Sequence, residues 1–238
     1  MMFPKNESSG PSHEPEIRDD ETVERVGPFY FIQKKKGHRL TSDSVLLSEF
    51  VSDIDIKDSC RIIDIGTGTG AIPLLLAARS QATITAVEVE RGACEAAKRN
   101  IIANGLGGRC TIINSDYRDL SDVYPYGSFD MVVSNPPYTK KGAGRPSPCK
   151  ESEMARSEVL GSLSELVAVS GHLAGSKGRI FYVFPVIRLF EMLREARNAG
   201  LSVVRLRFIH FDRKKAARLF LIELRSTGTL SIEAPQFV

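Results

Sequence analysis

Three glycines at every second position follow an acid near the end of an apolar segment. The segment 61–65 leads into the pattern Asp64-x-Gly66-x-Gly68-x-Gly70. Glycines remove side chains where the backbone must turn sharply and approach a ligand closely. Dinucleotide sites use the different spacing GxGxxG, in which the third glycine comes one residue later. We therefore expect a ligand site at this turn without a pyrophosphate, where Asp64 faces an ammonium group.

Two further acids follow the next apolar segments of the chain. Glu88 lies near the end of the segment 83–89, and Asp116 comes shortly after the segment 110–114. A carboxylate at the end of the second strand accepts both ribose hydroxyls in nucleotide-binding folds, and we expect this role for Glu88. Asp116 is a candidate acceptor for the amine of an adenine ring. The alternative for Asp116 is an acid that caps a turn or a helix.

The segment Asn135-Pro136-Pro137-Tyr138 directly follows the apolar run 129–134. Its two prolines restrict the backbone, so the Asn135 side chain and the Pro136 carbonyl are held in one orientation. Both groups are acceptors, which a planar amino group needs because its lone pair is delocalised. If the ligand at the glycine turn carries a methyl group on a sulfonium, the nitrogen can attack that methyl group in line. The rate of this step then depends mainly on positioning. Tyr138 is expected to stack on the target ring. A plain Asn-Pro turn is the alternative.

The elements that position these residues alternate between strands and helices. Strands are expected at about 29–33, 61–65, 83–89, 110–114, 129–134, 179–184, 201–208 and 217–224. Helices are expected from Asp43, as a capping residue, to 50, and at about 74–77, 91–104, 151–171 and 186–199. This order predicts an α/β fold with a mostly parallel, seven-stranded sheet and helices on both faces. An antiparallel edge strand is expected because no helix joins the last two strands.

The glycine turn and the Asn-Pro-Pro-Tyr segment resemble those of class I (Rossmann-like) amino-methyltransferases that act on adenine N6, guanine N2 or glutamine N5. A narrower resemblance covers most of residues 27–238. It is to the tRNA1(Val) adenine-37 N6-methyltransferases, and it is carried by the segments 37–47, 72–77, 133–138, 155–158 and 183–193. Ser157 departs from the pattern, because a histidine is expected at its position.

This resemblance implies S-adenosylmethionine as the cofactor and an adenine in tRNA as the substrate. The implied cofactor-binding residues are Asp64, Gly66, Thr67, Gly68, Gly70, Glu88, Asp116 and Asn135. The implied catalytic residues are Asn135, Pro136 and Tyr138. A glutamine N5-methyltransferase of the release-factor type is an alternative, although only 63 residues precede Asp64, which leaves little room for that family's helical domain. A catalytically inactive module that binds RNA or a nucleotide is the other alternative.

The distribution of charge favours a polyanionic partner. The net charge is +3, but residues 1–24 carry seven acids and two bases, a net of −5, so the remainder carries 3 − (−5) = +8. A basic body suits nucleic acid. The expected RNA-binding residues are Lys140, Lys141, Arg145 and Lys150, in the long loop after Tyr138, together with Lys35 and Arg39 before the glycine turn. A third basic group consists of Arg213, Lys214, Lys215 and Arg218. Solvated surface side chains are the alternative for each.

Length and composition limit how the chain can be organised. Of its 238 residues 42% are hydrophobic, enough for one full core. Residues 1–22 are expected to form an acidic, disordered tail, and residues 23–238 a single domain with a strand–helix extension at 23–58. No apolar run reaches the roughly 20 residues that span a bilayer, and no signal peptide is evident. We therefore expect a cytoplasmic protein without a membrane partner. No His/Cys cluster predicts a metal, and the four cysteines are expected to be small buried hydrophobes.

Overall fold

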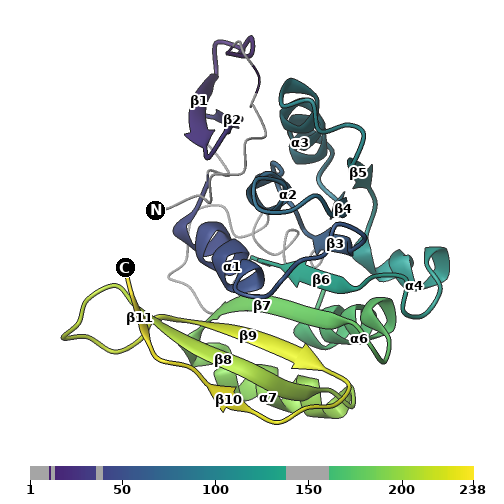
Figure 1. The fold of residues 1–238 in the computed structure, drawn as a ribbon, viewed down its shortest axis with the longest axis vertical. Coiled ribbons are helices and arrows are strands. Elements are labelled where there is room, and N and C mark those ends of the chain that lie inside the picture. The colour runs from purple at the N-terminus through teal and green to yellow at the C-terminus, as the bar shows by residue number, and fades with distance from the viewer. Residues whose placement is uncertain (1–10, 12–13, 36–39, 138–160) are drawn as a thin grey trace, which may run out of the picture.

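The computed structural model describes residue 11 and residues 14–35, 40–137 and 161–238. A central sheet dominates the structure (Figure 1). Its strands are β3 (Arg61–Ile65), β4 (Thr83–Glu88), β5 (Cys110–Asn114), β6 (Met131–Ser134), β7 (Arg179–Pro185), β8 (Ser202–His210), β9 (Leu219–Arg225) and the short strands β10 (Ser231–Ile232) and β11 (Gln236–Phe237). The strand order is β10-β8-β9-β7-β6-β3-β4-β5, and β11 also pairs with β8.

The sheet is mostly parallel, as the sequence predicts. Strands β5, β4, β3, β6 and β7 pair in parallel, whereas β9 is antiparallel to both β7 and β8. The β8–β9 hairpin is the expected antiparallel pair at this side of the sheet, with β9 inserted between β7 and β8. The inserted strand keeps β8 parallel to β7, so the carboxyl ends of both strands lie at the same edge.

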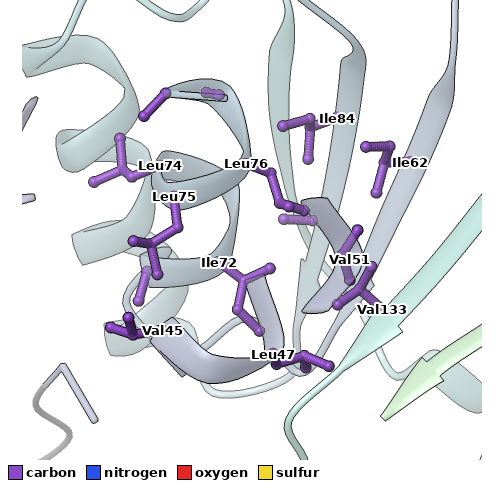
Figure 2. Packing of buried hydrophobic residues seen from close by; sticks show 14 of the residues in the cluster. Val45, Leu47, Val51, Ile62, Ile72, Leu74, Leu75, Leu76, Ile84 and Val133 are labelled. Carbon is purple, nitrogen blue, oxygen red and sulfur yellow. The ribbon is translucent and has the colours of Figure 1, made fainter. Parts of the chain in front are cut away.

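Helices cover both faces of the sheet and bury one hydrophobic cluster on each. One face carries α1 (Ser42–Ser52), α2 (Ala71–Ala77) and α3 (Arg91–Ala103), and the other carries α4 (Leu120–Val123), α6 (Leu163–Ala174) and α7 (Leu189–Asn198). Alternation along β3 sends Ile62 to the first cluster and Ile63 to the second. Every residue of α2 is buried, and its leucines pack against α1 and the sheet (Figure 2).

An N-terminal hairpin packs on α3. It consists of β1 (Glu21–Val26) and β2 (Phe29–Lys34), and only β2 is predicted from the sequence. Strand β1 begins at Glu21, one residue before the expected end of the tail at residue 22. The cause is a tertiary contact, because the buried Glu21 carboxylate pairs with Arg99 of α3. That guanidinium holds the pKa of Glu21 below its ordinary value.

Two helices begin at different residues from those expected. The helix expected from about 151 begins after Ser162, which forms a capping box with Glu165; the first ten residues of the expected helix lie outside the described residues. The N-cap of α1 is Thr41 rather than Asp43. The Thr41 hydroxyl accepts from the backbone N–H of Ser44, and Asp43 occupies the first turn, where its charge favours the helix dipole.

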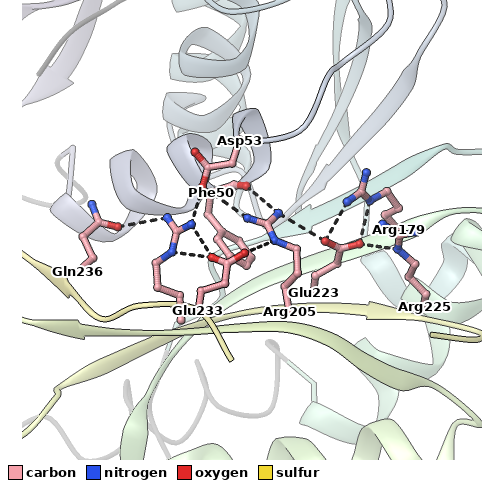
Figure 3. Close-up of polar contacts among 9 residues, drawn as sticks. Phe50, Asp53, Arg179, Arg205, Glu223, Arg225, Glu233 and Gln236 are labelled. Atoms are coloured by element: carbon pink, nitrogen blue, oxygen red, sulfur yellow. Dashed lines mark hydrogen bonds and ion pairs between the residues drawn. The ribbon is translucent and has the colours of Figure 1, made fainter. Parts of the chain in front are cut away.

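A network of arginines and acids joins α1 to the antiparallel side of the sheet (Figure 3). Glu223 of β9 is wholly buried and accepts from Arg179 at 2.8 Å and from Arg225 at 2.5 Å. Arg205 contacts Glu223 at 3.5 Å and Asp53, the C-cap residue of α1, at 3.4 Å. Glu233, near the C-terminus, pairs with Arg205 and Arg207. The C-terminal segment is thereby anchored to the face that carries α1.

Three further sequence expectations concern membranes, cysteines and metals. Within residues 14–35, 40–137 and 161–238, no helix is long and apolar enough to cross a membrane. Cys60, Cys94 and Cys110 are buried free thiols, as predicted, whereas Cys149 lies outside the described residues. Among the residues that the structure describes, no three potential metal ligands come together.

Candidate active site

The glycine turn and Asn135 extend from neighbouring strands at the carboxyl edge of the sheet. Strands β3 and β6 pair in parallel, with Asp64 opposite Val133. The Ser134 hydroxyl donates to the carbonyl of Ile65 at 2.7 Å and ties the two strand ends together. Ligands of open α/β sheets bind at this edge. The two motifs found in the sequence therefore border one site.

The glycine turn leaves open space on one side and packs closely on the other. A Cβ added at Gly66 or Gly68 would meet no atom within 4 Å, so a ligand has room to approach the backbone there. Gly70 has a φ of 87° and caps α2. A Cβ at Gly70 would lie 3.2 Å from the Cβ of Ala97, so the third glycine is needed for helix packing as well as for its backbone conformation.

Asp64 is a buried acid without hydrogen-bonded partners among the described residues. Its exposed fraction is 0%, and neither carboxylate oxygen has a partner there; the buried hydroxyl of Thr67 also has none. Burial raises the pKa of Asp64 to about 7, and the negative charge of Glu88 adds to the rise. An unpartnered buried carboxylate is costly unless a cation or donors reach it. Asp64 therefore fits a ligand that supplies an ammonium group.

Glu88 connects the end of β4 to the glycine turn. One carboxylate oxygen accepts from the Gly68 N–H at 2.8 Å, and the other accepts from the Glu90 N–H at 2.9 Å. These bonds hold the carboxylate in one orientation beside the turn. An ionised carboxylate has about four acceptor sites, so two remain for ligand hydroxyls. The observed position fits the ribose contact that the sequence predicts.

Asp116 acts as a cap in this structure. It is the N-cap of the 3₁₀ turn η1 (Tyr117–Asp119), and its Oδ1 accepts from the Arg118 N–H at 2.9 Å. The Arg118 side chain contacts both carboxylate oxygens of Asp116 and lowers its pKa. The capping role is the alternative that the sequence left open. The predicted contact of Asp116 with adenine stays a prediction.

Asn135 is held by a residue of α1 that sequence reasoning missed. The Asn135 Nδ2 donates to the Ser44 hydroxyl at 3.1 Å, across 91 residues of sequence. This bond points the Nδ2 of Asn135 toward α1 and thereby fixes which side of the amide carries Oδ1. Ser44 is buried, whereas Asn135 and Pro136 are partly exposed. The amide of Asn135 is thus oriented while a substrate still has access to it.

Asn100 of α3 is a second residue that the sequence did not indicate. It is wholly buried, and its Nδ2 donates to the carbonyl of Thr69 in the glycine turn and to the carbonyl of Ile32 in β2, both at 2.9 Å. Its Oδ1 accepts from the Ile32 N–H at 2.7 Å. Asn100 therefore joins the N-terminal hairpin to the turn that borders the site.

Most of the predicted substrate-binding residues are not described by the structure. Tyr138, Lys140, Lys141, Arg145, Lys150 and Arg39 lie outside the described residues. Lys35 is described and exposed, and its ammonium group donates to the carbonyl of Asp19 at 2.8 Å. The proposed RNA contacts of these residues remain predictions.

Known proteins resemble this chain in sequence and in structure. Residues 41–183, more than half of the chain, match the methyltransferase small domain family. A relative from Porphyromonas gingivalis, named tRNA1(Val) (adenine(37)-N6)-methyltransferase, is 32% identical over 83% of this chain and 78% of its own length. A structure from Agrobacterium tumefaciens, described as a predicted O-methyltransferase, has a TM-score of 0.64 and 21% identity over 82% of this chain and 86% of that one. The structure of M. jannaschii TYW2 in complex with AdoMet has a TM-score of 0.59 and 14% identity, and the match covers 88% of this chain and 87% of that one.

The fold is that of a class I methyltransferase. The chain belongs to the methyltransferase small domain family, in the group whose relatives are named tRNA1(Val) (adenine(37)-N6)-methyltransferase.

Proposed function

We propose that this methyltransferase transfers a methyl group from S-adenosylmethionine to N6 of an adenine in tRNA. The observation that carries the proposal is the Asn135 amide, oriented by Ser44 and placed beside the glycine turn. The names of the curated relatives support the choice of substrate. A tRNA substrate also agrees with the cytoplasmic location expected from the sequence.

The described residues fit the cofactor. The Asp64 carboxylate accepts the ammonium of the methionine part, the space over Gly66 and Gly68 receives the ligand against the backbone, and Glu88 accepts the ribose hydroxyls. The predicted contacts of Thr67 and Asp116 complete this set. S-adenosylmethionine supplies a methyl group on a positively charged sulfur, which a neutral nitrogen attacks in line.

The target nitrogen needs to be oriented rather than deprotonated beforehand. The Oδ1 of Asn135 and the carbonyl of Pro136 accept the two N–H groups of the adenine amine. These bonds draw electron density toward the nitrogen and aim its lone pair at the methyl group. After transfer the nitrogen carries an extra proton, which is lost to solvent. Tyr138 is proposed to stack on the adenine ring and keep it in this plane.

Methyl transfer to competing substrates tests the proposal. The full-length protein is incubated with methyl-labelled S-adenosylmethionine and either unmodified tRNA or a release factor. Label in the tRNA alone is expected, and label in the release factor alone would move the assignment to a glutamine N5-methyltransferase. If neither substrate is labelled although calorimetry detects cofactor binding, tRNA methylation is wrong.

A further inference from the structure

The connection between β8 and β9, residues 211–218, lies at the same edge of the sheet as the candidate active site. Leu219 pairs with Pro185 of β7 on one side and with Ile209 of β8 on the other. The Val186 N–H, just after β7, donates to the carbonyl of Arg218 at 3.0 Å. Leu219 lies two strands from β6, and its partner Pro185 lies three residues beyond Tyr182, the partner of Ser134 at the end of β6. With about 4.8 Å between strands and about 3.3 Å per residue, the β9 end of the connection lies about 14 Å from the end of β6. Figure 1 shows it at the left, projecting beyond the hairpin.

This connection carries a concentrated positive charge. It contains Arg213, Lys214, Lys215 and Arg218 against one acid, Asp212, a net of 4 − 1 = +3, and all four basic residues are exposed. Asp212 pairs with Lys215 at 3.2 Å. In the described part of the chain, no carboxylate lies within ion-pair distance of the other three bases.

Two of these cations are positioned by aromatic rings. The guanidinium of Arg213 lies 5.4 Å from the ring centre of Phe237, and that of Arg218 lies 5.6 Å from the ring centre of Phe211. A ring on one face of a guanidinium restricts its motion and leaves its N–H groups available to an anion. The arginines are thus presented to a partner without being neutralised.

An exposed apolar pair lies on the segment that this connection contacts. Ile187 follows Val186 directly, and Phe190 lies in the first turn of α7; they are 86% and 85% exposed, the highest values among the large hydrophobic residues that the structure describes. The next turns of α7 bury Met192 and Ala196 against the sheet. Exposed aromatic rings and unpaired cations are the groups that stack bases and contact phosphates of single-stranded nucleic acid.

We infer that these residues form a binding surface for the unpaired tRNA nucleotides that flank the target adenine. Arg213, Lys214 and Arg218 contact phosphates, and Phe190 and Ile187 contact an unstacked base. The inference rests on the proposed function and adds to it, because it assigns tRNA contacts to residues other than those that follow Asn135 in the sequence. An adenine can enter the site only if it is unpaired, so its neighbours in the strand are the natural occupants.

A charge-removal variant and a matched control test the role of the cations. The loop variant carries Arg213→Ala, Lys214→Ala and Arg218→Ala. The control variant removes three exposed bases at the opposite edge of the sheet, with Lys57→Ala, Lys177→Ala and Arg197→Ala. The loop variant is expected to bind unmodified tRNA about tenfold or more weakly, and the salt dependence of binding is expected to fall by about one charge for each lost contact. Affinity for S-adenosylmethionine is expected to be unchanged in both variants.

Equal losses of tRNA affinity in the loop and control variants would mean that only overall charge matters, and would overturn the inference. Wild-type affinity in the loop variant would also overturn it. If the wild-type protein does not methylate tRNA, the proposed function itself fails, so the two failures are distinguishable.

A second pair of variants tests the stacking contact. Phe190→Ser is expected to raise the KM for tRNA about fivefold or more, because base–aromatic stacking contributes that much to single-strand binding. Tyr126→Ser is the control, since Tyr126 is an exposed aromatic residue just before β6, at the opposite edge. An unchanged KM in Phe190→Ser would show that Phe190 and Ile187 are not part of the tRNA-binding surface.

Discussion

Replacing Asp64 with asparagine is expected to stabilise the protein and to weaken its binding of cofactor. The two side chains have nearly the same shape, but asparagine cannot ionise. In the wild-type protein Asp64 is wholly buried without a hydrogen-bonded partner among the described residues, and burial raises its pKa to about 7. The buried charge therefore destabilises the free protein, and it becomes favourable only when a ligand cation is bound.

The size of this effect follows from linkage. The ordinary pKa of Asp64 is 3.8 and the folded value is about 7, a difference of about 3. At about 1.4 kcal/mol for each pH unit, this difference amounts to about 4 kcal/mol. The folded pKa is higher than the unfolded one. Ionisation of Asp64 therefore leaves the free energy of unfolding at its full value below pH 3.8 and lowers it as the pH rises from 3.8 to about 7.

Urea unfolding without cofactor at pH 5 and at pH 8 measures the effect. Asp64→Asn is expected to exceed the wild-type free energy of unfolding by about 4 kcal/mol at pH 8 and by only about 1–2 kcal/mol at pH 5. Asp58→Asn, at an exposed acid just before β3, is the control and is expected to change little. Equal stability of Asp64→Asn and wild type at both pH values would show that the Asp64 charge does not destabilise the fold. Calorimetry is expected to show roughly ten- to a hundredfold weaker binding of S-adenosylmethionine to Asp64→Asn.

Asn135→Ala is expected to abolish methyl transfer while calorimetry shows nearly unchanged cofactor affinity; activity close to wild type would remove the proposed role of this amide. Ser44→Ala removes the hydrogen bond that orients Asn135 and is expected to lower kcat about fivefold, measured under saturating substrate, with cofactor affinity unchanged. A kcat equal to that of wild type would show that the bond is dispensable. Glu223→Gln is expected to lower the free energy of unfolding by about 3–5 kcal/mol at pH 7, because it removes the charge that the surrounding arginines share. Burial raises the pKa of Glu223, but the hydrogen bonds and charges of Arg179 and Arg225 outweigh burial and hold this pKa below its ordinary 4.5. The stabilisation is therefore full above pH 4.5 and is lost as the pH falls through the folded pKa. Urea titrations of wild type and variant at pH 7 and pH 3 that show a constant difference would contradict this prediction.

Sequence reasoning was most successful where the determining signals are local. The apolar runs that become β3, β4 and β6 are largely buried, whereas the run that becomes the edge strand β5 is only partly buried. All four end in turn residues, so both their positions and their shared carboxyl edge could be predicted. The glycine spacing of the turn from Asp64 to Gly70 differs from the GxGxxG spacing of dinucleotide sites. Its placement beside Asn135 follows from the parallel order of the strands.

Contacts between distant segments could not be predicted in this way. Ser44 lies 91 residues from Asn135, and Asn100 lies 68 residues from Ile32, so no local pattern connects them. Strand β1 was missed for the same reason, because its polar sequence becomes ordered through the pairing of Glu21 with Arg99 and through its register with β2. The capping role of Asp116 was foreseen only as an alternative, since a short acid after a strand suits a cap and a ligand equally well.

Identification of the methylated nucleoside distinguishes methylation of adenine N6 from every other reaction of this protein with tRNA. Unmodified tRNA is incubated with S-adenosylmethionine and either the wild-type protein or Asn135→Ala, then digested to nucleosides that mass spectrometry identifies. N6-methyladenosine is expected with the wild-type protein and not with the variant. A different methylated nucleoside, or N6-methyladenosine formed equally by Asn135→Ala, would contradict the assignment of the Asn135 site to adenine N6 methylation.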